Sequence, residues 1–119
     1  MRYMMLFKPD KPPEPGVSPC KQQLPEMAKL MGELRKSGVL VATEGLMPSD
    51  TGARLRLSDG KLTVRDGPFA EAKELVAGFA IVNVKSKAQA LELAKRFLTI
   101  AGGGESDVLE VMEVPATGH

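Results

Sequence analysis

The chain has 119 residues, a length that favours one domain, and its apolar fraction of 43% and charged fraction of 26% are ordinary for a globular protein with a real core. A formal net charge of +1 supplies no global field to attract nucleic acid or an acidic membrane, so neither is expected as a partner without a local patch. Cys20 is the only cysteine, which excludes an intramolecular disulfide and argues against a cysteine-based zinc site.

The first predicted element is a strand over residues 3–7, whose apolar side chains alternate between both faces. Residues 1–7 are too short for a signal peptide or a membrane span, and prolines follow at once, so we expect a cytoplasmic protein. Residues 8–19 carry five of the nine prolines and predict an irregular surface connection.

A helix is predicted next and should end at Ser37-Gly38. Its start is open because proline does not fit the interior of an undistorted helix. Either the helix begins at Pro25, or a turn beginning near Ser18-Pro19 is kinked there. The apolar positions at helical spacing are Leu24, Met27, Leu30 or Met31, and Leu34.

A second strand and a β-hairpin are predicted in the middle of the chain. The strand spans residues 39–47 and is apolar on both faces except for Glu44. After a break at residues 48–52, two alternating segments flank Asp59-Gly60, the dipeptide typical of a two-residue hairpin turn. This turn predicts the cross-strand pairs Leu57 with Leu62, Leu55 with Val64, Arg56 with Thr63, and Arg54 with Arg65. The facing arginines repel unless a protein carboxylate or a bound anion compensates them.

The last third of the chain predicts a strand, a helix and a strand. The strand covers residues 76–84, with Phe79 and Ile81 on one face. Ser86 is the expected N-cap of the helix, with Gln89 completing a capping box, and residues 102–104 should end it. The expected buried stripe consists of Ala90, Leu91, Ala94, Phe97 and Leu98. The final strand is predicted over residues 108–114, followed by a flexible tail at 115–119.

This order of elements predicts an α+β fold, a ferredoxin-like split βαβ antiparallel sheet with an inserted β-hairpin, as one domain over residues 1–119. Two helices cover only one face of a four-stranded sheet, yet the predicted strands are apolar on both faces. Such a large exposed apolar surface is unusual in a monomer. We therefore expect a homodimer in which a second copy covers the open face.

The stretch from Arg65 to Glu74 combines turn dipeptides, a proline, a phenylalanine and alternating charges between two strand-like segments. Asp66 is its best candidate for chemistry and has two interpretations. It is a turn residue that caps backbone amides, or it belongs to a polar cluster beside an apolar wall of Phe69 and Phe79, as in a small-molecule site. The predicted ligand-binding residues are Glu44, Arg54, Arg65, Asp66, Pro68, Phe69, Glu71 and Lys73.

The segment Asp66-Gly67-Pro68-Phe69, continued by Gly78-Phe79 and the following helix, resembles the signature of the DGPF proteins, a branch of the YciI-like (YCII-related) family. The resemblance extends from Met1 to about Val114. It implies a dimeric α+β barrel, a putative site at the motif, and a biochemical role that is unsettled. Through family context it also implies an association with extracytoplasmic-function sigma factors.

Two departures from the relatives bear on function. Other YciI-like proteins pair a histidine on the first helix with an aspartate as a possible acid–base dyad, whereas this helix has Leu24, Glu26, Met27 and Lys29. The resemblance therefore implies no such dyad here. Ala80 and Leu93 stand where many relatives have bulky aromatic residues, which implies a cavity of different shape.

The remaining motifs predict no catalytic centre, metal site or cofactor. His119 is the only histidine and the terminal residue, and no spacing suits a metal ion. Residues 102–104 follow a helix and so do not form a phosphate-binding loop. Three function classes stay open: a small enzyme or small-ligand binder using the Asp66 region, an accessory or interaction module linked to transcription, and a structural dimer. Direct DNA binding is not expected, because the basic hairpin face is small and lacks interleaved aromatic residues.

Overall fold

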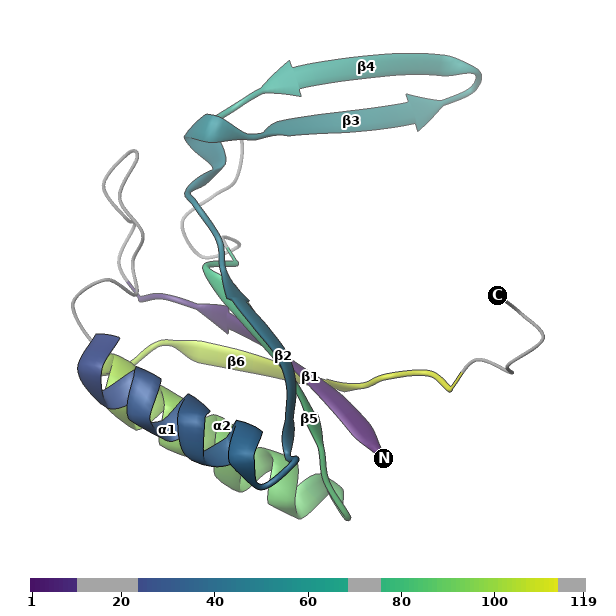
Figure 1. Cartoon of the computed structure of the whole chain (residues 1–119). Coiled ribbons are helices and arrows are strands. Elements are labelled where there is room, and N and C mark those ends of the chain that lie inside the picture. The colour runs from purple at the N-terminus through teal and green to yellow at the C-terminus, as the bar shows by residue number, and fades with distance from the viewer. Residues whose placement is uncertain (11–23, 69–75, 114–119) are drawn as a thin grey trace.

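The computed structural model of the chain describes residues 1–10, 24–68 and 76–113 (Figure 1). Residues 11–23, 69–75 and 114–119 lie outside the described part, and with them most of the expected irregular connection, the expected tail, Cys20 and His119. Of the predicted ligand-binding residues, Phe69, Glu71 and Lys73 also fall there.

The described part is an α+β fold with two α-helices and two antiparallel sheets, compatible with a ferredoxin-like architecture. The larger sheet has the strand order β2-β5-β1-β6, and β3 pairs only with β4 in a separate two-stranded sheet. The elements in chain order are β1 (Arg2–Lys8), α1 (Leu24–Lys36), β2 (Leu40–Gly45), the short 3-10 helix η2 (Ser49–Thr51), β3 (Ala53–Ser58), β4 (Lys61–Asp66), β5 (Gly78–Asn83), α2 (Lys87–Ala101) and β6 (Glu105–Glu110).

The core lies between the two helices and one face of the larger sheet. On β1, Tyr3 lies opposite Val82 of β5, and Met5 lies opposite Ala80 of β5 and Val108 of β6. Alternate residues of each strand thus face the helices. Both helices lie on the same side of the sheet (Figure 1). The buried cluster contains Tyr3, Met5, Leu30, Leu34, Leu40, Ala80, Val82, Val84, Ala90, Leu93 and Ala94.

The opposite face of the larger sheet, here called the open face, carries the other set of strand residues. Met4 lies opposite Ile81, and Leu6 opposite Phe79, and these four side chains are only partly buried. Leu109 on β6 is 57% exposed. Among the described residues, no helix covers this face (Figure 1). The larger sheet thus has apolar side chains on both faces, as the sequence predicts.

Helix α1 ends where the sequence predicts. Gly38 has φ +81°, a left-handed conformation that glycine adopts without strain, and the Val39 N–H donates to the Leu34 carbonyl at 2.9 Å. The helix is described from Leu24, with Pro25 in its first turn, as the start near Pro25 requires. The alternative turn at Ser18-Pro19 lies outside the described residues.

Helix α2 corrects two details of the prediction. The Gln89 N–H donates to Ser86 Oγ at 3.2 Å, which confirms the N-cap, but Gln89 Oε1 accepts from the Lys85 N–H at 3.0 Å, one residue earlier than in a standard capping box. Leu93 is buried, whereas the predicted Leu91 is 47% exposed. The buried positions Ala90, Leu93 and Ala94 are three and four residues apart, and Leu91 lies roughly 100° around the helix from Ala90.

Strand β6 begins earlier than predicted. It spans Glu105–Glu110 instead of residues 108–114, and Met112 beyond it is 79% exposed. Its polar first half gave no strand signal, yet β1 supplies a partner for it, from Lys8 opposite Glu105 to Tyr3 opposite Glu110. Polar residues are tolerated because β6 is an edge strand, and Lys8 Nζ lies 2.8 Å from Asp107 Oδ2. The predicted strands 39–47 and 76–84 are shortened to β2 and β5.

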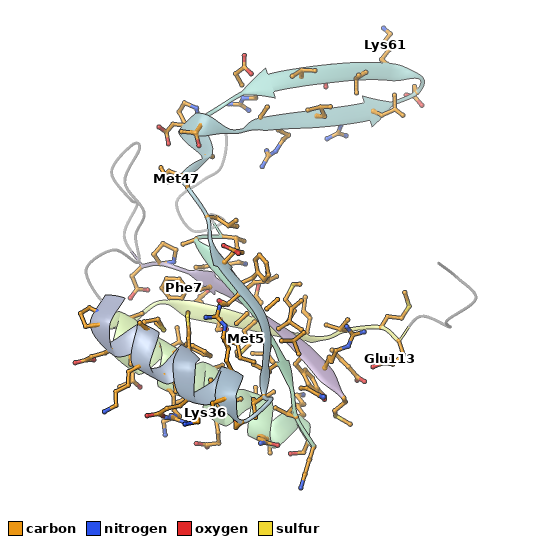
Figure 2. The ribbon with its side chains drawn as sticks, in the orientation of Figure 1. Met5, Phe7, Lys36, Met47, Lys61 and Glu113 are labelled. Carbon is orange, nitrogen blue, oxygen red and sulfur yellow. The ribbon has the colours of Figure 1, made fainter. Side chains whose placement is uncertain are left out.

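Strands β3 and β4 pair in the predicted register. Asp59 and Gly60 have φ values of +53° and +77°, as a tight primed turn requires, and all four predicted cross-strand pairs occur. This two-stranded sheet stands away from the larger sheet, on the side remote from the helices (Figure 1). Every one of its residues is exposed, and Figure 2 shows Lys61 near the tip of this sheet, away from the helices and the larger sheet.

Candidate functional site

The base of the β3–β4 sheet holds several of the predicted site residues. Arg54 lies opposite Arg65, and Asp66 opposite Ala53, at the open end of the two strands. These residues and Pro68 are exposed in the described part of the chain. The structure therefore brings Arg54, Arg65 and Asp66 together, but on an open surface.

Gly67 has a structural role in this segment. Its N–H donates to the Gly52 carbonyl at 2.9 Å, and a Cβ placed on Gly67 would overlap the Ser49 carbonyl. The close approach of the two backbones joins β4 to η2 and requires a residue without a side chain. Within η2, Asp50 Oδ1 is buried and has no hydrogen-bond partner among the described residues.

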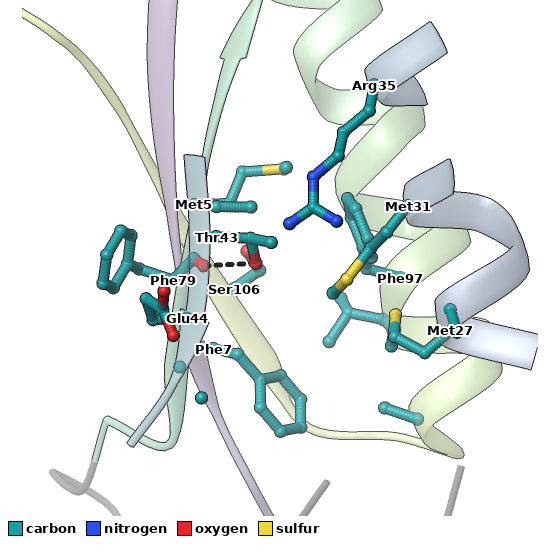
Figure 3. Close-up of a pocket in the computed structure, with 16 residues that line it drawn as sticks. Met5, Phe7, Met27, Met31, Arg35, Thr43, Glu44, Phe79, Phe97 and Ser106 are labelled. Carbon is teal, nitrogen blue, oxygen red and sulfur yellow. Dashed lines mark hydrogen bonds between the residues drawn. The ribbon is translucent and has the colours of Figure 1, made fainter. Parts of the chain in front are cut away.

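Glu44 does not lie with the arginines. It pairs with Phe79 across β2 and β5, which places both side chains on the open face of the larger sheet. Figure 3 shows these two side chains on the opposite side of the strands from Arg35 and Met31. Glu44 is exposed and Phe79 partly buried, so the predicted cluster around Asp66 is divided between two surfaces.

A cavity of about 330 Å³ lies between the helices and the larger sheet (Figure 3). Residues of α1, α2 and all four strands line it, mostly with apolar groups. Small-molecule sites are typically apolar hollows of about 300–1,000 Å³ with a few placed polar groups, and this cavity has those properties. We call it the helix-side cavity.

Small residues in one row across the sheet explain why the helix-side cavity exists. Gly45 pairs with Gly78, Gly78 with Phe7, and Phe7 with Ser106, so these four positions face the helices side by side. Only one of the four has a large side chain. A Cβ on Gly78 would lie 3.0 Å from the Glu44 carbonyl, so the close contact of β5 with β2 also favours glycine there. The space left by these residues is not filled by the helices above.

The larger apolar side chains on the helix side of the sheet that line this cavity include three methionines and two phenylalanines: Met5, Met27, Met31, Phe7 and Phe97. Methionine is flexible and polarisable, so such a wall adapts to ligands of different shape. Ala80, which the family resemblance already marked as unusually small, also lines the cavity. Its methyl group leaves room that an aromatic ring would occupy.

The polar side chains of the helix-side cavity are few. Thr43 Oγ1 already donates to the Phe79 carbonyl at 2.8 Å, the bond drawn in Figure 3. Arg35 extends from the last turn of α1, and its guanidinium group points toward Thr43 and Met5 (Figure 3). One flexible cation and the hydroxyl groups of Thr43 and Ser106 thus border a mostly apolar space.

Sequence reasoning did not find this cavity. Met27, Met31 and Arg35 follow one another at four-residue intervals, but the methionines were interpreted as core residues of α1. The row of small residues becomes visible only from the strand register. The sequence signal that could have indicated the cavity is Arg35, a cation on the same helix face as Met27 and Met31.

Within residues 1–10, 24–68 and 76–113, no group of three or more His, Cys, Asp and Glu residues is arranged to hold a metal ion. No helix in those ranges is long and apolar enough to span a membrane.

Comparison with known proteins places these features in a family. A family model described as the YCII-related domain matches residues 1–114. An uncharacterised protein of Rhizobium meliloti (strain 1021) is 40% identical over 60 residues, which cover 50% of this chain and 48% of that protein. The chain thus aligns with about half the length of this relative.

Proposed function

Because the chain belongs to the YCII-related family, whose matching model covers residues 1–114, we propose that it is a small-molecule-binding protein that acts as a homodimer. Its ligand occupies the helix-side cavity. The observation that carries this proposal is an apolar space of about 330 Å³ lined from both helices and all four strands of the larger sheet.

The size and lining of the cavity favour a ligand over a packing defect. Protein interiors contain few voids larger than a water molecule, because each void costs stability. This space opens to solvent and is therefore not a sealed void, and its volume of about 330 Å³ and its border of flexible methionines are those of a ligand pocket. A bound apolar molecule would recover the missing contacts.

Dimerisation is supported by the open face. Met4, Leu6, Phe79 and Ile81 form a continuous, partly exposed apolar patch across β1 and β5. A two-fold related copy packed sheet to sheet would bury this patch against itself, as in a dimeric α+β barrel. The helices lie on the opposite side of the sheet, so this dimer would leave the helix-side cavity accessible. Light scattering at micromolar concentration tests it, and a mass of 12.8 kDa would reject it.

Methionine methyl groups give a direct test of ligand binding. The chain has seven methionines, of which Met5, Met27 and Met31 line the helix-side cavity. In a protein labelled with ¹³C at the methionine methyls, titration with octanol should shift these three NMR signals in a saturable way. Met1, Met47 and Met112 are exposed and serve as internal controls. Equal shifts at all methyls, or none, would contradict the proposed site.

The base of the β3–β4 sheet is a second candidate location, for an anionic ligand held by Arg65 beside Asp66. The observation in its favour is the exposed position of Arg65 next to Asp66 at the base of the two strands, because a guanidinium group binds carboxylate and sulfate ions through parallel N–H donors. The other proposed residues of this anion site are Pro68, Phe69, Glu71 and Lys73. Sulfate titration of wild type and Arg65→Gln tests it: binding lost in the variant supports this location, and no binding to wild type rejects it.

An interaction module is the second candidate function, in line with the implied association with sigma factors. It is favoured by the exposure of Leu55, Leu57, Leu62 and Val64, which are 60–71% exposed on one face of the β3–β4 sheet. A protein partner would cover them. Calorimetric titration with a purified extracytoplasmic-function sigma factor tests this function. Binding that Leu57→Asp abolishes would favour it, and no heat of binding to wild type would count against it.

A further inference from the structure

Arg35 lies where an amphiphilic ligand would place its polar end. Its backbone belongs to the last turn of α1, and the residue as a whole is exposed. Yet the side chain borders the helix-side cavity, and Figure 3 shows its guanidinium group directed toward Thr43. The charge therefore stands at the mouth of an apolar space, in contact with both solvent and cavity.

No carboxylate of the described residues neutralises Arg35. The ion pairs found in the described ranges join Arg2 to Glu113, Lys8 to Asp107, and Arg96 to Glu33. Glu44 is the acidic residue bordering the cavity, and its side chain projects to the other side of β2 (Figure 3). An anion entering from solvent would thus find this guanidinium group available.

The position of Arg35 is not explained by the end of α1 alone. A cation in the last turn of a helix stabilises the helix dipole by about 0.3–1 kcal/mol, and Lys36 in the same turn can provide this effect. Lys36 does not line the cavity. The two adjacent cations therefore differ in only one relevant property, their relation to the cavity, and form a matched pair for testing.

The volume limits the size of the ligand. At about 30 Å³ for each water-sized group, 330 Å³ accommodates roughly ten groups. One cation can compensate one negative charge, and the neutral hydroxyl groups of Thr43 and Ser106, which also line the cavity, supply no second cation for a doubly charged phosphate. A planar carboxylate matches the two parallel N–H donors of a guanidinium group.

From these observations we infer that the helix-side cavity takes a compact apolar monocarboxylic acid, with its carboxylate bound to Arg35 and its hydrocarbon part among Met5, Met31 and Phe97. The inference rests on the proposed function and specifies its ligand class. Arg35 is a specificity-determining residue, because it separates an acid from the neutral molecule of the same shape. The apolar wall holds both.

Octanoate and octanol at neutral pH test this inference, because they share a hydrocarbon tail and differ in the charged head group. The dissociation constant of each is measured from the shifts of the Met5 and Met31 methyl signals, in wild type, Arg35→Gln and Lys36→Gln. We expect wild type and Lys36→Gln to prefer octanoate by at least about tenfold, the effect of one charged hydrogen-bonded pair. Arg35→Gln should lose that preference and bind octanol as wild type does.

The outcomes separate the inference from the proposed function. If octanol binds but Arg35→Gln keeps the preference for octanoate, the cavity is a ligand site and the role of Arg35 is wrong. If Lys36→Gln loses the preference as strongly as Arg35→Gln, the effect is one of net charge and the inference is also wrong. If neither compound shifts the three cavity methyls, the proposed function itself fails. Unchanged octanol binding by Arg35→Gln shows that this variant remains folded.

Discussion

Both sheets of this molecule are antiparallel, with side chains on alternating faces. They differ in that helices cover one face of the larger sheet (Figure 1), whereas every residue of the β3–β4 sheet is exposed. In the larger sheet, Met5 and Val82 are 4% and 0% exposed because α1 and α2 cover them. In the β3–β4 sheet, Leu57 and Leu62 pair in the same manner yet are 71% and 61% exposed. Alternation therefore predicts which side chains share a face, whereas burial depends on whether another element covers that face.

The largest expected effect is the difference in unfolding free energy between replacing a leucine by alanine in the core and doing the same in the β3–β4 sheet. Leu30→Ala removes a side chain that is 4% exposed within the core and should lower the free energy of unfolding by about 3 kcal/mol. Leu57→Ala at a 71% exposed position should change it by less than about 0.5 kcal/mol. Urea denaturation measures both. A large cost for Leu57→Ala would show that the β3–β4 sheet is covered in solution, by a second copy or another part of the chain.

A charge on the open face tests the proposed dimer. Ile81→Arg places a cation in the centre of the apolar patch and should weaken association by about 2 kcal/mol or more, giving monomers at micromolar concentration. The matched control is Leu91→Arg, on the exposed surface of α2, which should leave the mass unchanged. Sedimentation analysis distinguishes the two. If Ile81→Arg is still a dimer, the dimer interface does not lie on the open face.

Gly67 joins β4 to η2, and its substitution tests that contact. Gly67→Ala introduces a methyl group that overlaps the Ser49 carbonyl, and the required backbone shift should cost roughly 2 kcal/mol. If the β3–β4 sheet is independent of the core, the loss will appear as faster hydrogen exchange in β3 and β4, with the core amides unchanged. If the amides of β3 and β4 and those of the core all exchange as slowly as in wild type, the close contact at Gly67 does not stabilise this part of the chain.

The smallest expected effect concerns an exposed helix position. No atom lies within 4 Å of the position that a Cβ on Gly32 would take, and the residue sits in the interior of α1. Gly32→Ala should raise the free energy of unfolding by about 0.5–1 kcal/mol, since alanine loses less backbone entropy in a helix. Thermal melting measures the change. Destabilisation instead would indicate that a segment outside the described residues packs against α1.

Features determined by a few adjacent residues could be predicted from the sequence. Asp59-Gly60 specifies a turn of defined geometry, and so the register of β3 and β4 followed, including the facing Arg54 and Arg65. Ser86 marked the start of α2 by the same local chemistry. The apolar alternation likewise assigned Phe79 and Ala80 to opposite faces of β5.

Features that depend on distant partners could not be predicted. The first half of β6 is polar and becomes a strand only because β1 offers an unpaired edge. Burial of Leu93 in place of Leu91 depends on how α2 is rotated against the sheet. The helix-side cavity depends on Gly45, Gly78 and Ser106, which are far apart in sequence and adjacent only through strand pairing.

The Asp66 stretch shows why an unusual local sequence is an ambiguous sign of function. Its turn dipeptides and charges predicted a ligand site, and that site remains a proposal. In the described residues, Gly67 serves to bring β4 against η2, a contact that the sequence alone does not reveal. A backbone role and a ligand role both require special residues, so residue type alone does not separate them.

A crystal structure of the protein grown with octanoate would show whether the ligand binds in the helix-side cavity or at the base of the β3–β4 sheet. We expect density for the hydrocarbon chain between Met31 and Phe97, with the carboxylate against the Arg35 guanidinium group. Density at the base of the β3–β4 sheet beside Arg65, with the helix-side cavity closed by its own side chains, would contradict this expectation.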